Sequence, residues 1–350
     1  MPSGVLAQLS LGATVVVIRL RSLGDTVLTT PALALLKWAR PDLRVVIVSE
    51  APFDAVFDGS PDVTSVLVVQ RDGGFWDRLA TFRAIRRQGA ELCLNLHGGT
   101  TSAWMTALSG ARYRAGFEHF RMGFAYNLRI PRAQEILGRT KDAPVHTAEH
   151  LASAIFHLGA SRTEIPRAVL AASPPARTTP YAVFHVTAAY FTKQWPTARF
   201  REIAEHVRRD CALEPIMIAG PGEGAVFQEL PGFTCFDNLD VRSLRSLLAG
   251  ARLFVGNDSG PAHMAAAFGV PCVVIFGSSN SAVWRPWKTP HAVVETAWDC
   301  KPCPGDRCYA FDEPRCILSI ETASVKHAIG ELLQERAEAV PARRVRSNDE

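Results

Sequence analysis

The 350-residue sequence contains no apolar run of the roughly 18–20 residues that a membrane-spanning helix needs. Its first residues, MPSGVLAQLSLGA, lack the basic segment that opens a secretory signal peptide. Hydrophobic residues make up 47% and charged residues 21% of the chain, the balance of an ordinary globular protein. We therefore expect a cytoplasmic protein and, from its length, two domains.

Two nucleotide-binding signatures are also missing. The loop RSLGD (21–25) has a single glycine where a dinucleotide-binding protein needs GxGxxG. The glycine-rich turn GPGEG (220–224) lacks the lysine of a phosphate-binding P-loop. Because no nucleic-acid-binding motif is found either, nucleic acid is not an expected partner.

Apolar runs alternate with helical patterns along the whole chain. Near-continuous apolar strands separated by helices are typical of parallel sheets covered on both faces. Helical periods fill 31–40, 75–89 and 146–159. The runs predict strands at 14–20, 45–49, 63–69, 91–96, 181–186, 214–220, 234–239, 252–255 and 272–277.

A stretch rich in proline and short polar residues, ASPPARTTP (172–180), interrupts this alternation and reads as a linker. We expect an α/β protein with two Rossmann-like domains, 1–173 and 174–336, facing a central cleft. The polar tail 337–350 is expected to be disordered.

Sites in open parallel sheets lie beyond the carboxyl ends of the strands. Three side chains in such loops could carry chemistry. Asp25 follows the first strand and could act as a general base or simply cap a helix. Lys193 could meet a phosphate or remain solvated, and Glu223 could hold sugar hydroxyls or lie on the surface.

The stretch GNDSGPAHMAAAFGVP (256–271) predicts a strand end, a turn and a short helix with Pro261 near its start. A helix N-terminus presents unpaired N–H groups and a partial positive charge, which bind phosphate. Gly260 would let a ligand approach the backbone, and Ser259 and His263 would add polar groups. Asp258 would repel phosphate and fits sugar hydroxyls better. The pattern therefore indicates a site for a nucleotide-linked sugar.

Basic residues gather in the first half of the chain. Within 112–141, seven arginines and lysines face only two acids. Such a cluster could form a surface for an anionic partner, or a solvated face without a partner.

Several of these motifs together resemble glycosyltransferase family 9, the ADP-heptose:lipopolysaccharide heptosyltransferases. The resemblance covers nearly the whole chain. Its most specific parts are VIRLRSLGDTVLTTPAL and VGNDSGPAHMAAAFGVPCVVIFG, and KQWP (193–196), SGARYRAGF (109–117) and HTAEHLASAIFHLG (146–159) follow in the same order.

This resemblance implies a GT-B fold with the acceptor in the N-terminal domain and the donor in the C-terminal domain. It implies transfer of heptose from ADP-heptose to the lipopolysaccharide inner core, with inversion and without a metal ion. The acceptor would be an anionic, lipid A-type molecule at the inner membrane surface, where the enzyme would be peripheral. Residues 112–121 would form part of the acceptor surface, with Arg112, Arg114 and Arg121 as contacts.

The resemblance also implies roles for single residues. Asp25 would be the general base that deprotonates the acceptor hydroxyl. Asp258 would bind the heptose and Glu223 the ribose. Three further residues would meet the diphosphate and stabilise the departing charge: Lys193, Ser259 and Gly260. His263 would support the phosphate end.

Four cysteines near the end have the spacing C-x2-C-x4-C-x7-C, at Cys300, Cys303, Cys308 and Cys316. In a cytosolic chain such a cluster favours a metal over disulfides. Structural zinc or an iron–sulfur cluster would fit, and a set of reduced thiols is the alternative. Catalysis would need no cofactor.

Other functions stay open at this point. One is transfer of a different sugar, or to a different glycan, within the same family. A second is epimerisation of a sugar nucleotide, and a third is a non-enzymatic scaffold built around the cysteine cluster.

Overall fold

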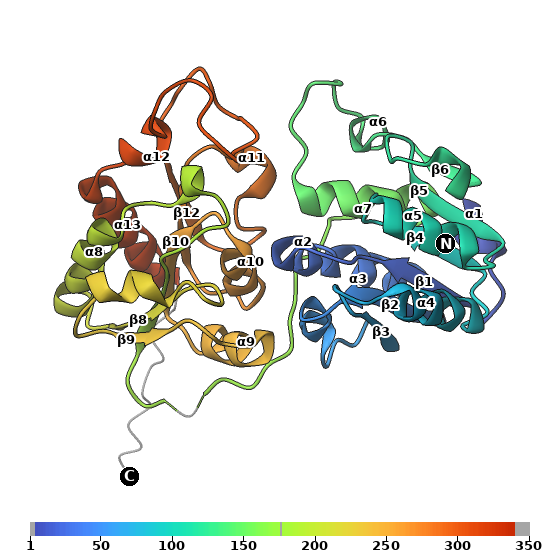
Figure 1. Cartoon of the computed structure of the whole chain (residues 1–350), viewed down its shortest axis with the longest axis horizontal. Coiled ribbons are helices and arrows are strands. Elements are labelled where there is room, and N and C mark those ends of the chain that lie inside the picture. The colour runs from blue at the N-terminus through green and yellow to red at the C-terminus, as the bar shows by residue number, and fades with distance from the viewer. Residues whose placement is uncertain (1–3, 176, 340–350) are drawn as a thin grey trace, which may run out of the picture.

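The structure is a computed structural model that describes residues 4–175 and 177–339. The chain forms two halves that lie side by side, and each is built on a six-stranded parallel sheet (Figure 1). In the N-terminal half the strand order is β3-β2-β1-β4-β5-β6. Its strands are β1 (Thr14–Ile18), β2 (Arg44–Glu50), β3 (Ser65–Val69), β4 (Leu92–Asn95), β5 (Tyr113–Phe117) and β6 (Leu128–Ile130).

The C-terminal sheet repeats the same pattern. Its order is β12-β11-β10-β7-β8-β9, which is again third, second, first, fourth, fifth and sixth along the chain when read from β9. Both halves are therefore doubly wound Rossmann-like folds, as the sequence predicts. The strands are β7 (Tyr181–His185), β8 (Glu214–Ile218), β9 (Thr234–Phe236), β10 (Leu253–Asn257), β11 (Cys272–Phe276) and β12 (His291–Glu295).

Helices cover both faces of each sheet, so the central strands are buried throughout. Along β1, Val15 and Val17 join one apolar cluster while Val16 and Ile18 join another on the opposite face. The N-terminal helices are α1 (Gly4–Gln8), α2 (Leu23–Val27), α3 (Thr30–Ala39), η1 (Phe53–Phe57), α4 (Phe75–Arg87), α5 (Thr100–Leu108), η2 (Gly123–Ala125), α6 (Ala133–Leu137) and α7 (Thr147–Leu158). The C-terminal helices are η3 (Phe191–Lys193), α8 (Thr197–Asp210), η4 (Gly224–Glu229), α9 (Val241–Ala249), α10 (Gly260–Ala267), α11 (Ser281–Trp284), α12 (Arg315–Leu318) and α13 (Thr322–Ala339).

All nine predicted strands are present, and three further strands, β5, β6 and β12, were not predicted. These three lie toward the outer edges of the sheets, where strands are less apolar. Of the tail predicted to be disordered, 337–339 are the last residues of α13, and 340–350 lie outside the described residues. None of the described helices combines the length and apolarity needed to cross a membrane.

The two halves meet most closely where α2 packs against α10. A Cβ atom added to Gly24 would lie 2.6 Å from the His263 ring. One added to Gly260 would lie 2.8 Å from Cβ of Leu23. Because neither position carries a side chain, α2 and α10 can pack closely against each other.

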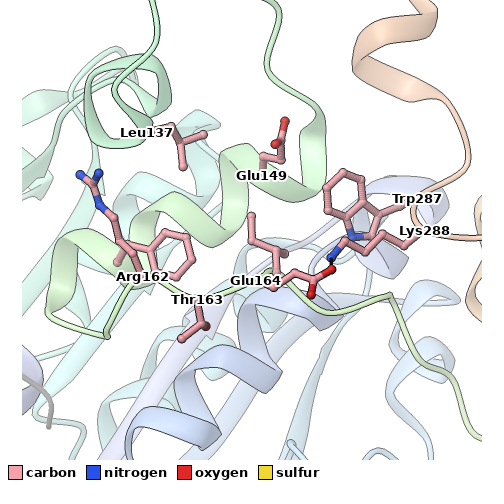
Figure 2. A pocket seen from close by; sticks show the side chains of 9 residues that line it. Leu137, Glu149, Arg162, Thr163, Glu164, Trp287 and Lys288 are labelled. Atoms are coloured by element: carbon pink, nitrogen blue, oxygen red, sulfur yellow. Dashed lines mark hydrogen bonds and ion pairs between the residues drawn. The ribbon is translucent and has the colours of Figure 1, made fainter.

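Two further contacts join the halves. Arg245, buried on α9, donates hydrogen bonds to the backbone carbonyls of Ala55 and Asp58 at η1. On another side, Trp287 donates from Nε1 to the Pro166 carbonyl at 2.9 Å, and Lys288 pairs with Glu164 (Figure 2). Several distinct contacts therefore fix how the halves sit.

We expect Gly260→Ala to lower the free energy of unfolding by about 1–3 kcal/mol, because overpacking forces α2 and α10 apart. Gly330→Ala is the matched control. Nothing lies within 4 Å of a Cβ at position 330 on α13, so alanine there should stabilise by about 0.5–1 kcal/mol. Urea unfolding of both variants measures the difference. Equal effects of the two substitutions would contradict the packing role of Gly260.

Candidate active site

A cavity of about 720 Å³ lies between the two halves and is lined by both. It sits at the carboxyl ends of the strands that flank the switch point of each sheet, where open α/β sheets bind ligands. The N-terminal half supplies Ser22, Leu23, Gly24, Asp25 and Phe53. The C-terminal half supplies His185, Thr187, Ala188, Ala189, Tyr190, Lys193, Gly220, Glu223, Asp258, Ser259, Gly260, Pro261, His263 and Trp284. All seven residues predicted as catalytic base or donor contacts therefore line one cavity.

Asp25 lies in the first turn of α2, directly after β1. Its carboxylate forms an ion pair with Arg19 and accepts a hydrogen bond from Oγ of Ser22 at 2.9 Å. Arg19 is buried, and burial lowers its pKa from the usual value while the neighbouring Asp25 opposes that shift. Arg19 also donates to the Leu96 carbonyl at 2.5 Å, which fixes the guanidinium against β4. The carboxylate is thus held by a cation and turned to the cavity.

Asp258 and Lys193 form the charged centre of the C-terminal wall. Lys193 Nζ lies 3.0 Å from Oδ2 of Asp258, and Ser279 donates to the same oxygen at 2.6 Å. The Asp258 side chain is only 7% exposed. Because both contacts use Oδ2, Oδ1 has no hydrogen bond from these two partners.

The start of α10 carries no side-chain cap. Ser259 occupies the N-cap position, but its Oγ shares a hydrogen bond of 2.8 Å with Nδ1 of His185. A helix end without a side-chain cap keeps N–H groups free for an anion. Gly260 lines the cavity, and the absence of a side chain there also makes room for Leu23 of α2.

His263 and Glu223 are placed differently from one another. His263 is buried beneath Gly24, burial lowers its pKa, and its Nδ1 atom has no hydrogen-bond partner among the described residues. Glu223 accepts a hydrogen bond from the Gly220 backbone N–H at 2.9 Å, so part of its carboxylate orders its own turn.

The predicted acceptor arginines do not line the cavity. Arg112 precedes β5, at the edge of the sheet opposite to Asp25, and lies over the Tyr113 ring. Arg114 donates to the Ala125 carbonyl at 3.1 Å. Arg121 follows the carboxyl end of β5 and is exposed, on the same edge as Asp25.

Sequence reasoning missed several residues near Asp25. Arg19 lies within the apolar run of the first predicted strand. A charged residue inside such a run was the available sign of a functional position. His97, His119 and His150 stand in loops and on α7, and the His150 ring stacks on Phe117 with centroids 4.1 Å apart. Histidines directly after strands β4 and β5 were the available signal.

The predicted metal centre is not supported. Among residues 4–175 and 177–339, no three His, Cys, Asp or Glu side chains converge in a way that could hold a metal ion. Cys316 is buried on α12, where burial raises the pKa of its thiol, whereas Cys300 is exposed and Cys303 and Cys308 are half-buried on the preceding loop. The thiols of Cys300 and Cys303 lie near enough to Cys316 to raise its pKa further, but among the described residues the four thiols do not converge as the ligands of a metal ion.

Two Rossmann-like halves with a charged cavity between them define the class of this protein as a two-domain α/β protein that binds ligands in an interdomain cleft. The chain belongs to glycosyltransferase family 9 (heptosyltransferase), whose family model matches residues 78–310. It is therefore a glycosyltransferase. Membership of this family excludes the epimerase and scaffold hypotheses.

Named relatives agree with this family. The chain is 27% identical over 315 residues to lipopolysaccharide heptosyltransferase 1 of Pseudomonas aeruginosa, covering 83% of this chain and 85% of that protein. It is 24% identical over 298 residues to lipopolysaccharide heptosyltransferase 3 of Escherichia coli, covering 75% and 83%. The solved structure of E. coli ADP-heptose LPS heptosyltransferase II has a TM-score of 0.76 at 16% identity, covering 93% of this chain and 99% of that one. The fold is therefore GT-B, as the resemblance implies.

Several buried histidines should make the free energy of unfolding depend on pH. Burial lowers the pKa of His97, His150 and His185 to about 4, and in His97 and His150 nearby positive charge adds to the effect. In the unfolded chain these groups titrate near 6.5. Unfolding therefore takes up protons between pH 6.5 and about 4, so the free energy of unfolding should fall as the pH falls through that window.

His150→Phe should flatten this dependence, because it keeps an aromatic ring against Phe117 and removes the titrating group. His327→Phe is the control, since His327 is an exposed residue of α13. Urea unfolding across the window measures both slopes. A slope in His150→Phe equal to that of the wild type would contradict the prediction.

Proposed function

We propose that the protein transfers heptose from ADP-heptose to the inner core of lipopolysaccharide, with inversion and without a metal ion. Residues 1–173 would bind the anionic, lipid A-linked acceptor, and residues 174–336 would bind the donor. The reaction would take place at the cytoplasmic face of the inner membrane. The two lipopolysaccharide heptosyltransferases to which the chain is similar support this choice of sugar and acceptor.

One observation carries the proposal. A carboxylate from one half, Asp25, faces the same cavity as a lysine and a helix N-terminus from the other half, Lys193 and the start of α10. A base on one wall and an anion-binding group on the opposite wall are what a direct displacement at a sugar carbon requires.

In the proposed step, Asp25 takes the proton of the acceptor hydroxyl. The hydroxyl oxygen forms a bond to the anomeric carbon while the bond from that carbon to the phosphate oxygen breaks. ADP leaves with the electron pair of the broken bond. Because attack and departure occur on opposite faces of the sugar in one displacement, the configuration inverts.

The groups around Asp25 suit it to this role. Its ion pair with buried Arg19 and its hydrogen bond from Ser22 hold the carboxylate in one orientation. A fixed orientation favours proton transfer, because geometry decides whether a base can reach its proton.

The leaving diphosphate would meet positive charge on the C-terminal wall. Lys193 lies at the cavity with its ammonium already placed by Asp258, and Ser259 and the backbone of Gly260 begin α10. A lysine and a helix dipole together stabilise departing negative charge, which is the task a divalent ion performs in other enzymes. This arrangement supports catalysis without a cofactor.

The other donor contacts follow from position. Oδ1 of Asp258 can accept from heptose hydroxyls, and Glu223 lies at the rim for the ribose hydroxyls. His263, with its unpartnered Nδ1 atom, would support the phosphate end. On the acceptor side we retain Arg121, which follows the carboxyl end of β5, because Arg112 and Arg114 lie at the amino end of that strand.

The first test is equilibrium binding of sugar nucleotides in the presence of a chelator. We expect ADP-heptose to bind, and UDP-, GDP- and CDP-sugars to bind at least about tenfold more weakly. The proposed site would contact both the base and the sugar of ADP-heptose, and the other compounds differ in these groups. Calorimetry with each compound measures this. Preference for a different sugar nucleotide would favour the alternative of another sugar within the same family.

The second test concerns the base. Asp25→Asn keeps the shape of the side chain and removes its ability to accept the proton. We expect turnover to fall by about 10²–10⁴-fold while the dissociation constant of ADP stays within about twofold of the wild type. Asp72→Asn, an exposed carboxylate on the loop before α4, is the control and should keep full turnover. Retained turnover in Asp25→Asn would remove Asp25 from the mechanism.

A further inference from the structure

Large apolar side chains gather on one surface of the N-terminal half, outside the cavity. Phe75 and Trp76 at the start of α4 are 72% and 75% exposed. Trp104 and Leu108 on α5 and Phe124 in η2 are also exposed, and α5 contacts both α4 and η2. We refer to these five side chains as the aromatic patch.

Three patch residues, Phe75, Trp104 and Leu108, line a groove of about 400 Å³ between α4 and α5, together with Leu79 and Phe82. The Trp104 and Phe124 rings meet edge to face with centroids 5.5 Å apart. Helix α4 packs against the core through the buried Ile85 and the partly buried Phe82, whereas Phe75 and Trp76 in its first turn are exposed. The Phe75 and Trp76 rings contact each other at the surface, and exposed apolar clusters of this kind mark interaction sites.

Arginines frame the same surface. Arg78, Arg83, Arg86 and Arg87 are exposed on α4, and none of the four pairs with a carboxylate among residues 4–175 and 177–339. The acidic residue of this helix, Asp77, accepts a hydrogen bond from the Gly74 N–H at 2.9 Å and so serves the helix start. The charge around the patch is therefore positive.

The start of the aromatic patch and Asp25 lie at the same edge of the N-terminal sheet. Helix α4 begins after the carboxyl end of β3, and α5 begins after that of β4, as Asp25 follows that of β1. In a parallel sheet these ends share one edge. Phe75 and Trp76 therefore stand at the edge of the sheet that also carries Asp25.

We propose that the aromatic patch and its arginines dock the protein on a bilayer that contains anionic phospholipids. Tryptophan and phenylalanine insert at the boundary between headgroups and acyl chains, and arginines bind the phosphates of the headgroups. Charge complementarity favours a membrane over an apolar protein partner, because the positive frame would meet a continuous negative surface. Docking also rests the acceptor edge of the cleft on the membrane, a consequence that depends on the function proposed above, whereas docking itself does not.

The experiment is co-sedimentation of the full-length protein with vesicles of equal parts phosphatidylcholine and phosphatidylglycerol, and with vesicles of phosphatidylcholine alone. We expect binding to the anionic vesicles and weak binding to the neutral ones. The double variant Phe75→Ala/Trp76→Ala should lower the partition coefficient by about tenfold or more through lost apolar burial. Arg83→Gln/Arg87→Gln should lower it by about twentyfold, and added salt should reduce that difference.

Two matched variants serve as controls. Trp38→Ala removes another exposed tryptophan, on α3, and Arg201→Gln removes an exposed arginine on α8. Both should bind the vesicles like the wild type. All variants should keep the unfolding midpoint and ADP affinity of the wild type, because the substituted side chains are exposed and lie outside the cavity.

Three outcomes would overturn the proposal. They are a wild type that does not bind the anionic vesicles, patch variants that bind as well as the wild type, and a concentration-dependent dimer that Phe75→Ala/Trp76→Ala dissociates. The dimer would make the patch a protein interface. Because the assay needs neither donor nor acceptor, a chain that binds vesicles but transfers no heptose would overturn only the proposed function.

Discussion

Helices α2 and α10 touch through Gly24 and Gly260, and each glycine occupies a place where a side chain would collide with the other half of the molecule. Asp25 directly follows the first glycine, and Ser259 directly precedes the second. The packing of two short helices therefore determines that a carboxylate from one sheet and a helix N-terminus from the other line the same cavity. Without this approach, each half would carry only a fragment of the site.

Charge in the cavity is organised as two pairs, Arg19 with Asp25 and Lys193 with Asp258. Each pair places its charged groups before a ligand arrives, which lowers the cost of ordering them during binding. A diphosphate that enters near Lys193 competes with Asp258 for the ammonium, while Asp258 can turn to sugar hydroxyls. Burial keeps the nearby His185 neutral, with its pKa near 4, so the ring supports Ser259 by hydrogen bonding and adds no charge.

Sequence alone predicts nine strands, including the edge strands β3 and β9, because apolar runs and the polar residues directly after them follow simple rules. It fails at β5, whose Arg114 and Gly116 break the apolar pattern, since pairing with β4 and not hydrophobicity makes it a strand. It also misses Arg19, because only the tertiary structure shows that this buried arginine pairs with Asp25. The cysteine cluster misleads because spacing along the chain cannot show whether four thiols converge as metal ligands, and among the described residues they do not.

The repeated strand order explains why a transferase can be built from two similar halves. Each sheet has one switch point, where the strand order reverses. The contact between α2 and α10 brings the two switch points to the same cavity. One switch point alone can bind a nucleotide or position a base, but transfer needs both groups on opposite sides of one carbon. Duplication of the fold supplies the two sides, and the different loop residues give each side its chemistry. Under the proposed function, the carboxyl edge that carries Asp25 would also receive the acceptor, and Phe75 and Trp76 of the aromatic patch stand at that same edge.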